Sequence, residues 1–228
     1  MSKVQDEPHT LRAVYRRGVT VIALLVTPLS AFLLVFAPEV VRVLYGSRWD
    51  AVVVPFQILA GTMVFKTSYR MSDMVARASG TVYKRAFRQF LFAVMVFAGS
   101  WLGHFWGIVG VAVGVSVAIV VNFFSMAELS LRITKMGWPE LFALYVPTTV
   151  LGLIILGESW ALAFALRSLH TAPFVTLLAG AAVVGLTGLA LIWTAPKTFL
   201  GRDGAWIAGV LVGFLPGRFK RRLARLSA

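Results

Sequence analysis

The stretch Asp50–Gly80, DAVVVPFQILAGTMVFKTSYRMSDMVARASG, begins like an ordinary membrane-spanning helix and ends with charges that lipid does not tolerate. Its first half, residues 51–65, is almost wholly apolar. The second half carries charges spaced by four, three and four positions, which on a helix share one face: Lys66, Arg70, Asp73 and Arg77. Asp73 has an arginine three residues before it and another four residues after it, so we expect it to pair with both. The spacing predicts one helix over 51–78 with a stripe of charge.

Two interpretations of this stripe remain open. Ionisable groups within spanning segments usually face a bundle interior or a water-filled path, which favours a cavity. Alternatively, if the hydrocarbon core takes about 20 residues from Ala51, Lys66 lies close enough to its edge for the side chain to snorkel to the head groups. Snorkelling explains Lys66 but not why Arg70, Asp73 and Arg77 continue on the same face. We therefore predict that Lys66, Arg70, Asp73 and Arg77 line a substrate cavity.

The composition excludes an ordinary soluble domain. Of the 228 residues, 59% are hydrophobic and only 14% are charged, and the mean hydropathy is +0.83. The net charge of +13 comes from cations in loops and termini, which points to anionic lipids rather than to nucleic acid. The absence of cysteine excludes disulfides and thiol chemistry. The sequence predicts an all-α, polytopic membrane helix bundle.

The apolar stretches divide the chain into three parts. Residues 1–17 form an amphipathic cytoplasmic lead-in, and residues 196–228 form an interfacial and basic tail. Between them we expect six transmembrane helices: 18–36, 51–78, 86–102, 108–131, 139–169 and 173–193. A short surface helix, 39–45, should follow the first span and stop at Gly46.

Cations outside the membrane predict the orientation. One side of the predicted bundle has seventeen and the other side has only Arg42, Arg48 and Arg167. The seventeen are Lys3, Arg12, Arg16, Arg17, Arg77, Lys84, Arg85, Arg88, Arg132, Lys135, Lys197, Arg202, Arg218, Lys220, Arg221, Arg222 and Arg225. By the positive-inside rule both termini are cytoplasmic, which requires an even number of spans. The last five of these cations, with apolar residues between them, form a basic amphipathic anchor at the membrane surface.

Small residues predict close helix packing. Gly110 and Gly114 form a small-xxx-small pair in the fourth span, and Gly185 lies in the sixth. Asn122, Thr148 and Thr149 are polar at membrane depth, where hydrogen bonds between helices are the commoner role and contact with substrate is the alternative.

Enzymatic chemistry has little support in the sequence. The three histidines lie in a terminus and in turns, without carboxylates at triad or metal-ligand spacing. No paired carboxylates and no phosphate-binding glycine loop are visible. We expect no catalytic residues, no metal, no cofactor and no nucleic-acid partner.

Several short stretches, in order, resemble one family. They are Ser2-Lys3-Val4-Gln5-Asp6, Thr27-Pro28-Leu29, Ala37-Pro38-Glu39-Val40-Val41, Leu44-Tyr45-Gly46-Ser47-Arg48-Trp49, Ala76-Arg77-Ala78-Ser79-Gly80 and Gly107-Ile108-Val109-Gly110-Val111-Ala112. The chain resembles the oligosaccharide flippases of polysaccharide and lipopolysaccharide biosynthesis, in the multidrug/oligosaccharidyl-lipid/polysaccharide exporter superfamily. The resemblance implies export of an undecaprenyl-linked glycan across the bacterial cytoplasmic membrane by alternating access.

The resemblance also implies that the chain corresponds to the C-terminal portion of a longer, two-lobed flippase. Lys66, Arg70 and Arg77 would then offset the negative charge of a pyrophosphate-linked glycan. A partner that supplies the missing spans, or self-association, would complete the transporter. Two alternatives remain: a non-transporting truncated remnant, from a shortened gene or a misplaced start codon, and a membrane-embedded glycan-modifying enzyme.

Overall fold

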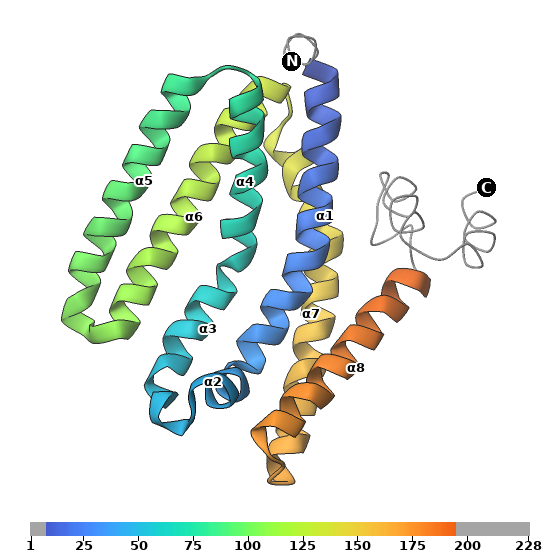
Figure 1. The fold of residues 1–228 in the computed structure, drawn as a ribbon. Coiled ribbons are helices and arrows are strands. Elements are labelled where there is room, and N and C mark those ends of the chain that lie inside the picture. Colours follow the sequence, from blue (N-terminus) through green and yellow to red (C-terminus); the bar gives the residue numbers. More distant parts are fainter. Residues whose placement is uncertain (1–7, 195–228) are drawn as a thin grey trace.

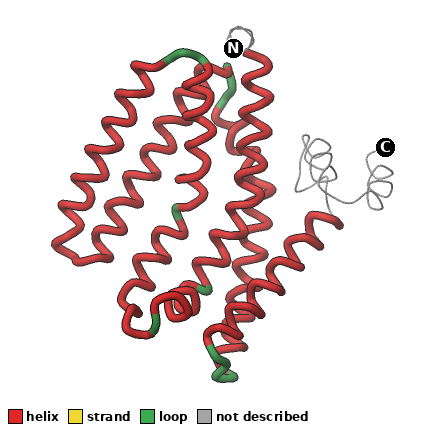
Figure 2. Tube along the Cα trace, in the orientation of Figure 1, coloured by secondary structure: helices red, strands yellow, loops and turns green. Residues whose placement is uncertain are grey.

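The computed structural model describes residues 8–194, which form an all-helical bundle (Figures 1 and 2). Within these residues every regular element is a helix, so the expected all-α class is confirmed. The first part of the lead-in, residues 1–7, and the whole basic tail lie outside the described residues.

Eight α-helices and two short 3₁₀ turns make up the described part of the chain. They are α1 (Pro8–Val35), α2 (Ala37–Tyr45), η2 (Ser47–Val52), α3 (Val53–Gly61), α4 (Met63–Ala78), α5 (Val82–Gly103), η3 (His104–Trp106), α6 (Gly107–Thr134), α7 (Trp138–Ser168) and α8 (Pro173–Thr194). The lead-in after residue 7 and the first expected span are one continuous helix, α1. The short helix α2 ends at Gly46, whose φ of 86° suits glycine.

The expected continuous helix over 51–78 is broken in the structure. It begins with η2, and α3 and α4 then meet at Thr62 with a bend of 42° between the two halves. Gly61 is a poor helix former, and the Thr62 hydroxyl donates a hydrogen bond of 2.9 Å to the Leu59 carbonyl. Such a local bond competes with the regular helical pattern. The sequence did not predict this break, because the apolar residues 51–65 lead directly into charges at helical spacing.

Four helical stretches are long and apolar enough to cross a membrane, or five if the bent pair counts as one span. They are Thr10–Val35, Val82–Thr134, Trp138–Ser168 and Pro173–Leu191, with the bent pair Ser47–Gly61 and Met63–Ala78. The stretch Val82–Thr134 contains both α5 and α6, which turn back on each other at η3 (Figure 1). The described chain therefore has the helices of a multi-pass membrane protein.

The helices form a bundle in which most of the long helices run between the same two ends (Figure 1). The α5–α6 hairpin lies on one side, α7 and α8 lie on the other, and α1, α3 and α4 lie between them. One core cluster joins α1, α4, α6 and α7: Tyr15, Val19, Val75, Ala127, Leu131, Met136 and Leu141. Another joins α1, α7 and α8: Leu24, Leu151, Ile155 and Val184.

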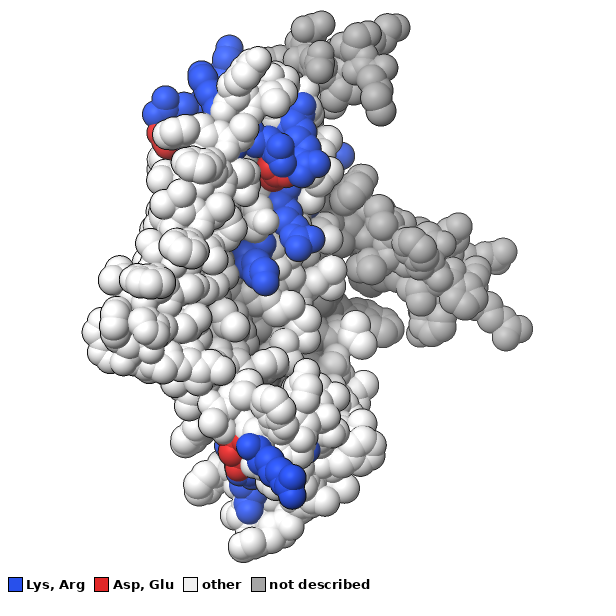
Figure 3. All heavy atoms as spheres, turned by 60° about the vertical axis from the view of Figure 1, so that its left-hand side comes forward, with Lys and Arg blue, Asp and Glu red and all other residues white. Residues whose placement is uncertain are grey.

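Charged side chains gather toward the two ends of the molecule (Figure 3). In that view a broad uncharged band separates the two groups, and basic side chains extend from the upper group into the band. The starts of α1, α5 and α7 lie at the upper end, and the turn at η3 and the α7–α8 connection lie at the lower end (Figure 1). We call these the α4–α5 end and the η3 end.

Candidate functional site

Helix α4 has one exposed face and one packed face. Lys66, Arg70, Met74 and Arg77 are exposed, at spacings of four, four and three residues. The packed face carries small or apolar side chains that lie against α1 and α6: Ser68, Ser72, Val75 and Ala76. The exposed residues form a stripe from the first turn of α4 to its end at the α4–α5 connection. We call Lys66, Arg70 and Arg77 the α4 stripe.

Asp73 lies at the edge of this stripe and is buried. One of its partners is the expected one, because Arg77 Nε donates a hydrogen bond of 2.8 Å to Asp73 Oδ2. The other is Arg85 of α5, which pairs with both carboxylate oxygens. The expected pairing with Arg70 does not occur among the described residues.

The turn between α4 and α5 explains this exchange of partners. Gly80 has a φ of 70°, which lets the chain reverse direction within three residues. Helix α5 then runs back beside α6, and its first turn lies close enough to the end of α4 for Arg85 to pair with the carboxylate (Figure 1). Arg85 stands twelve residues after Asp73, a spacing that no helical period predicts.

Lys66 and Arg70 differ from the other charges of α4. Both are exposed, and neither forms an ion pair or a side-chain hydrogen bond within residues 8–194. Lys66 lies in the first turn of α4, directly after the break at Thr62, where the helix dipole adds positive potential. This part of the stripe is therefore cationic and uncompensated.

Ion pairs between helices occur at both ends of the bundle. At the α4–α5 end, Glu140 of α7 accepts a hydrogen bond of 2.5 Å from Arg12 of α1 and forms an ion pair with Arg16 at 3.4 Å. At the η3 end, Arg167 of α7 pairs with the buried carboxylate of Glu39 on α2 at 2.8 and 2.9 Å. These cations stabilise helix contacts, which distinguishes them from Lys66 and Arg70.

Arg42 forms a local pair at the η3 end. Its Nε and terminal nitrogen each lie 2.9 Å from an Asp50 carboxylate oxygen. This bidentate hydrogen bonding raises the pKa of the Arg42 guanidinium, with the charge of Asp50 adding to the effect.

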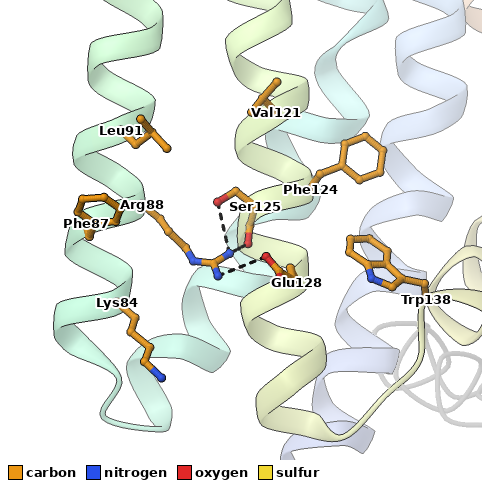
Figure 4. A pocket seen from close by; sticks show the side chains of 9 residues that line it. All are labelled: Lys84, Phe87, Arg88, Leu91, Val121, Phe124, Ser125, Glu128 and Trp138. Carbon is orange, nitrogen blue, oxygen red and sulfur yellow. Dashed lines mark hydrogen bonds and ion pairs between the residues drawn. The ribbon is translucent and has the colours of Figure 1, made fainter.

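A hollow of about 670 Å³ lies between α5 and α6 at the α4–α5 end (Figure 4). Arg88 extends from α5 toward α6, where it donates hydrogen bonds to the Ser125 carbonyl and, at 3.4 Å, to Glu128. The other lining residues are Lys84, Phe87, Leu91, Val121, Phe124 and Trp138. Sequence reasoning counted Lys84 and Arg88 only as loop charges, because it could not place α5 against α6.

The predicted packing glycines have different surroundings. A Cβ at Gly99 would lie 2.8 Å from the Gly114 carbonyl oxygen, and Gly110 faces Gly103 in the same way. Glycine at these positions therefore allows the backbones of α5 and α6 to touch. Gly185 is exposed on α8, and a Cβ there would meet open space within the described part of the chain.

Within residues 8–194, Asn122 and Thr148 do not form the expected hydrogen bonds between helices. The Thr148 hydroxyl donates to the Tyr145 carbonyl of its own helix at 2.9 Å. The buried Asn122 amide has no hydrogen-bond partner within residues 8–194. Serines connect the helices instead: Ser130 of α6 donates to the Ser72 carbonyl of α4, and the Ser72 hydroxyl lies 3.0 Å from Tyr15 of α1.

Among the described residues, no three His, Cys, Asp or Glu side chains come together in a way that could hold a metal ion. The predicted membrane anchor lies outside the described residues: Arg218, Lys220, Arg221, Arg222 and Arg225.

Comparison with known proteins gives one match. Residues 1–54 match the family model described as polysaccharide biosynthesis protein. This segment ends at the start of α3, before the α4 stripe. No curated protein and no solved structure matches the chain. The predicted resemblance to the polysaccharide biosynthesis protein family is therefore confirmed, and it is confirmed over residues 1–54.

Proposed function

We propose that this chain works as part of a flippase that exports a lipid-linked oligosaccharide across the bacterial cytoplasmic membrane. The observation that carries the proposal is the α4 stripe, in which Lys66 and Arg70 are exposed and without a partner in the described residues. A pyrophosphate-linked glycan carries negative charge beside a long apolar chain. Exposed cations on α4, which follows the apolar helix α3, complement both features.

The break between α3 and α4 supports the same reading. Membrane transporters often place helix breaks beside their substrate, because the start of a half-helix attracts anionic groups. Here α4 begins at Met63, and Lys66 follows within its first turn. The positive end of α4 and the Lys66 ammonium thus reinforce each other near the bend.

The proposed topology has six spans, with the η3 turn separating α5 from α6 and both termini in the cytoplasm. Within residues 8–194, and leaving out Lys66 and Arg70, the α4–α5 end carries nine cations and the η3 end carries three. The nine are Arg12, Arg16, Arg17, Arg77, Lys84, Arg85, Arg88, Arg132 and Lys135. This asymmetry favours a cytoplasmic α4–α5 end.

A cavity needs a second wall opposite the α4 stripe. Within residues 8–194 no helix covers Lys66 or Arg70, since both are exposed. The proposal therefore includes a second wall from another polypeptide segment or a second copy of this chain. Opening and closing of the two walls would give alternating access to the two membrane faces.

The test is binding of undecaprenyl pyrophosphate to the full chain in phosphatidylcholine nanodiscs. Losing two charge-assisted contacts of about 1.5 kcal/mol each corresponds to a Kd increase on the order of 100-fold for Lys66→Gln/Arg70→Gln. Arg48→Gln is the matched control, because Arg48 is an exposed cation at the η3 end. We expect Arg48→Gln to leave the Kd unchanged.

An unchanged Kd in the double variant would favour snorkelling and would remove the basis of the transport proposal. The same variants, assayed for movement of a fluorescent polyprenyl-pyrophosphate sugar between leaflets, separate binding from transport. Binding that is lost together with movement supports a substrate cavity. If the unaltered chain does not move the lipid either, the polypeptide that forms the second wall is absent from the nanodisc.

A further inference from the structure

We propose that the hollow between α5 and α6 binds an anionic phospholipid, with the phosphate beside Lys84 and Arg88 and an acyl chain along the α5–α6 seam. This inference concerns the α5–α6 hairpin and does not depend on transport. None of the α4 stripe residues lines the hollow.

The charges in and beside the hollow favour an anion. Glu128 is its only acidic lining residue, and it pairs with Arg88 at 3.4 Å and also with Arg132. Lys84 is exposed and forms no ion pair within residues 8–194. Three cations therefore stand around one carboxylate. A basic pocket between membrane helices at the cytoplasmic side is the arrangement that binds acidic lipid head groups.

The remaining walls are apolar and favour a lipid over a soluble anion. Phe87 and Leu91 line the α5 side, and Val121 and Phe124 line the α6 side (Figure 4). Trp138, at the start of α7, also lines the hollow and lies on the far side of α6 from α5 in Figure 4. Tryptophan is enriched where head groups meet hydrocarbon. A soluble phosphate would contact only the charged residues, whereas a phospholipid would contact the charged residues with its head group and the apolar residues with an acyl chain.

The apolar surface continues along the same seam. A second hollow of about 580 Å³ is lined by α5 and α6 residues nearer the η3 turn. On α5 the two hollows share one face, because Arg88, Leu91, Met95, Ala98 and Leu102 follow at three- or four-residue steps. From Lys84 to Met95 the helix rises about 16 Å, which is about half the hydrocarbon core and hence the depth of one leaflet.

The helix packing explains why the seam opens where the charges are. Gly99 and Gly103 contact Gly114 and Gly110, so the two backbones touch near the η3 turn. Toward the α4–α5 end, larger side chains separate the helices, and Arg88 spans the gap to Ser125. The α5–α6 seam therefore has charged side chains at the α4–α5 end and an apolar lining toward the η3 turn, which matches the head group and acyl chain of one lipid.

The test uses the full chain in nanodiscs that contain brominated phosphatidylglycerol or brominated phosphatidylcholine. Bromine quenches nearby tryptophan fluorescence, and the Trp138 signal is the difference between the unaltered chain and Trp138→Phe. We expect phosphatidylglycerol to quench Trp138 at a lower mole fraction than phosphatidylcholine. Because one surface cation contributes about 1 kcal/mol to binding an anionic lipid, Lys84→Gln should weaken this preference about fivefold.

Lys135→Gln is the matched control. Lys135 is an exposed cation at the same end, directly after α6, and it does not line the hollow. We expect it to leave the preference unchanged. Equal quenching by the two lipids, or equal effects of Lys84→Gln and Lys135→Gln, would overturn the proposal. Protection of Trp138 from both lipids would also overturn it, because protein would then cover the hollow.

Discussion

The two ends of the α4 stripe carry the same kinds of residue but have different surroundings. Near the α4–α5 connection, Arg77 pairs with the buried Asp73, and Arg85 joins from α5. One to three turns earlier on the same helix, Arg70 and Lys66 have no partner among the described residues. The first group stabilises a helix connection, and the second leaves positive charge free for a ligand. Position on a helix face is thus not enough to assign a role to a cation.

The largest expected effect is at Asp73. Asp73→Asn removes the charge that holds two guanidinium groups, and we expect it to lower the free energy of unfolding by about 2 kcal/mol. The measurement is denaturant unfolding of the full chain in detergent micelles. Glu128→Gln is the control, since Glu128 also pairs with two arginines but its side chain is 39% exposed. A loss no larger than that of the control would mean that solvent screens the Asp73 cluster.

A smaller effect distinguishes the two partners of Asp73. The side chain of Arg85 is 27% exposed and that of Arg77 is 65% exposed. Arg85→Gln should therefore cost about 1 kcal/mol, and Arg77→Gln should cost no more than about 0.5 kcal/mol, because exposed pairs are screened. A double-mutant cycle with Asp73→Asn measures each coupling directly. Stronger coupling to Arg77 would show that the turn at Gly80 does not hold Arg85 in place.

The smallest effect on stability is expected at Lys66 and Arg70. Lys66→Gln/Arg70→Gln should change the free energy of unfolding by less than about 0.5 kcal/mol, as is usual for exposed sites. The same unfolding experiment provides the measurement. Stability that is kept while undecaprenyl pyrophosphate binding is lost would sharpen the contrast with Asp73. A clear loss of stability would reveal structural partners for Lys66 or Arg70.

The glycines show the same contrast between residue type and surroundings. Gly110 and Gly114 lie against the backbone of α5, whereas no described residue lies close to the face of α8 that carries Gly185. All three stand in apolar helices, so the local pattern is the same for each. What differs is whether a second helix approaches that face.

The sequence by itself determined the all-helical class, the short helix that ends at Gly46 and the helical face shared by Lys66, Arg70 and Arg77, whereas Asp73 is buried at the edge of that face. These features depend on apolar runs, helical spacing and glycine, all of which act over a few residues. The family resemblance was predicted from six short stretches between residues 2 and 112, and the family match covers the four that lie within residues 1–54.

Only the tertiary structure decided the break at Thr62, the pairing of Arg85 with Asp73 and the hollow between α5 and α6. Each of these depends on how one helix lies against another, or on how a bend is accommodated between its neighbours. Such contacts join residues with no shared period, so neither spacing nor composition encodes them locally.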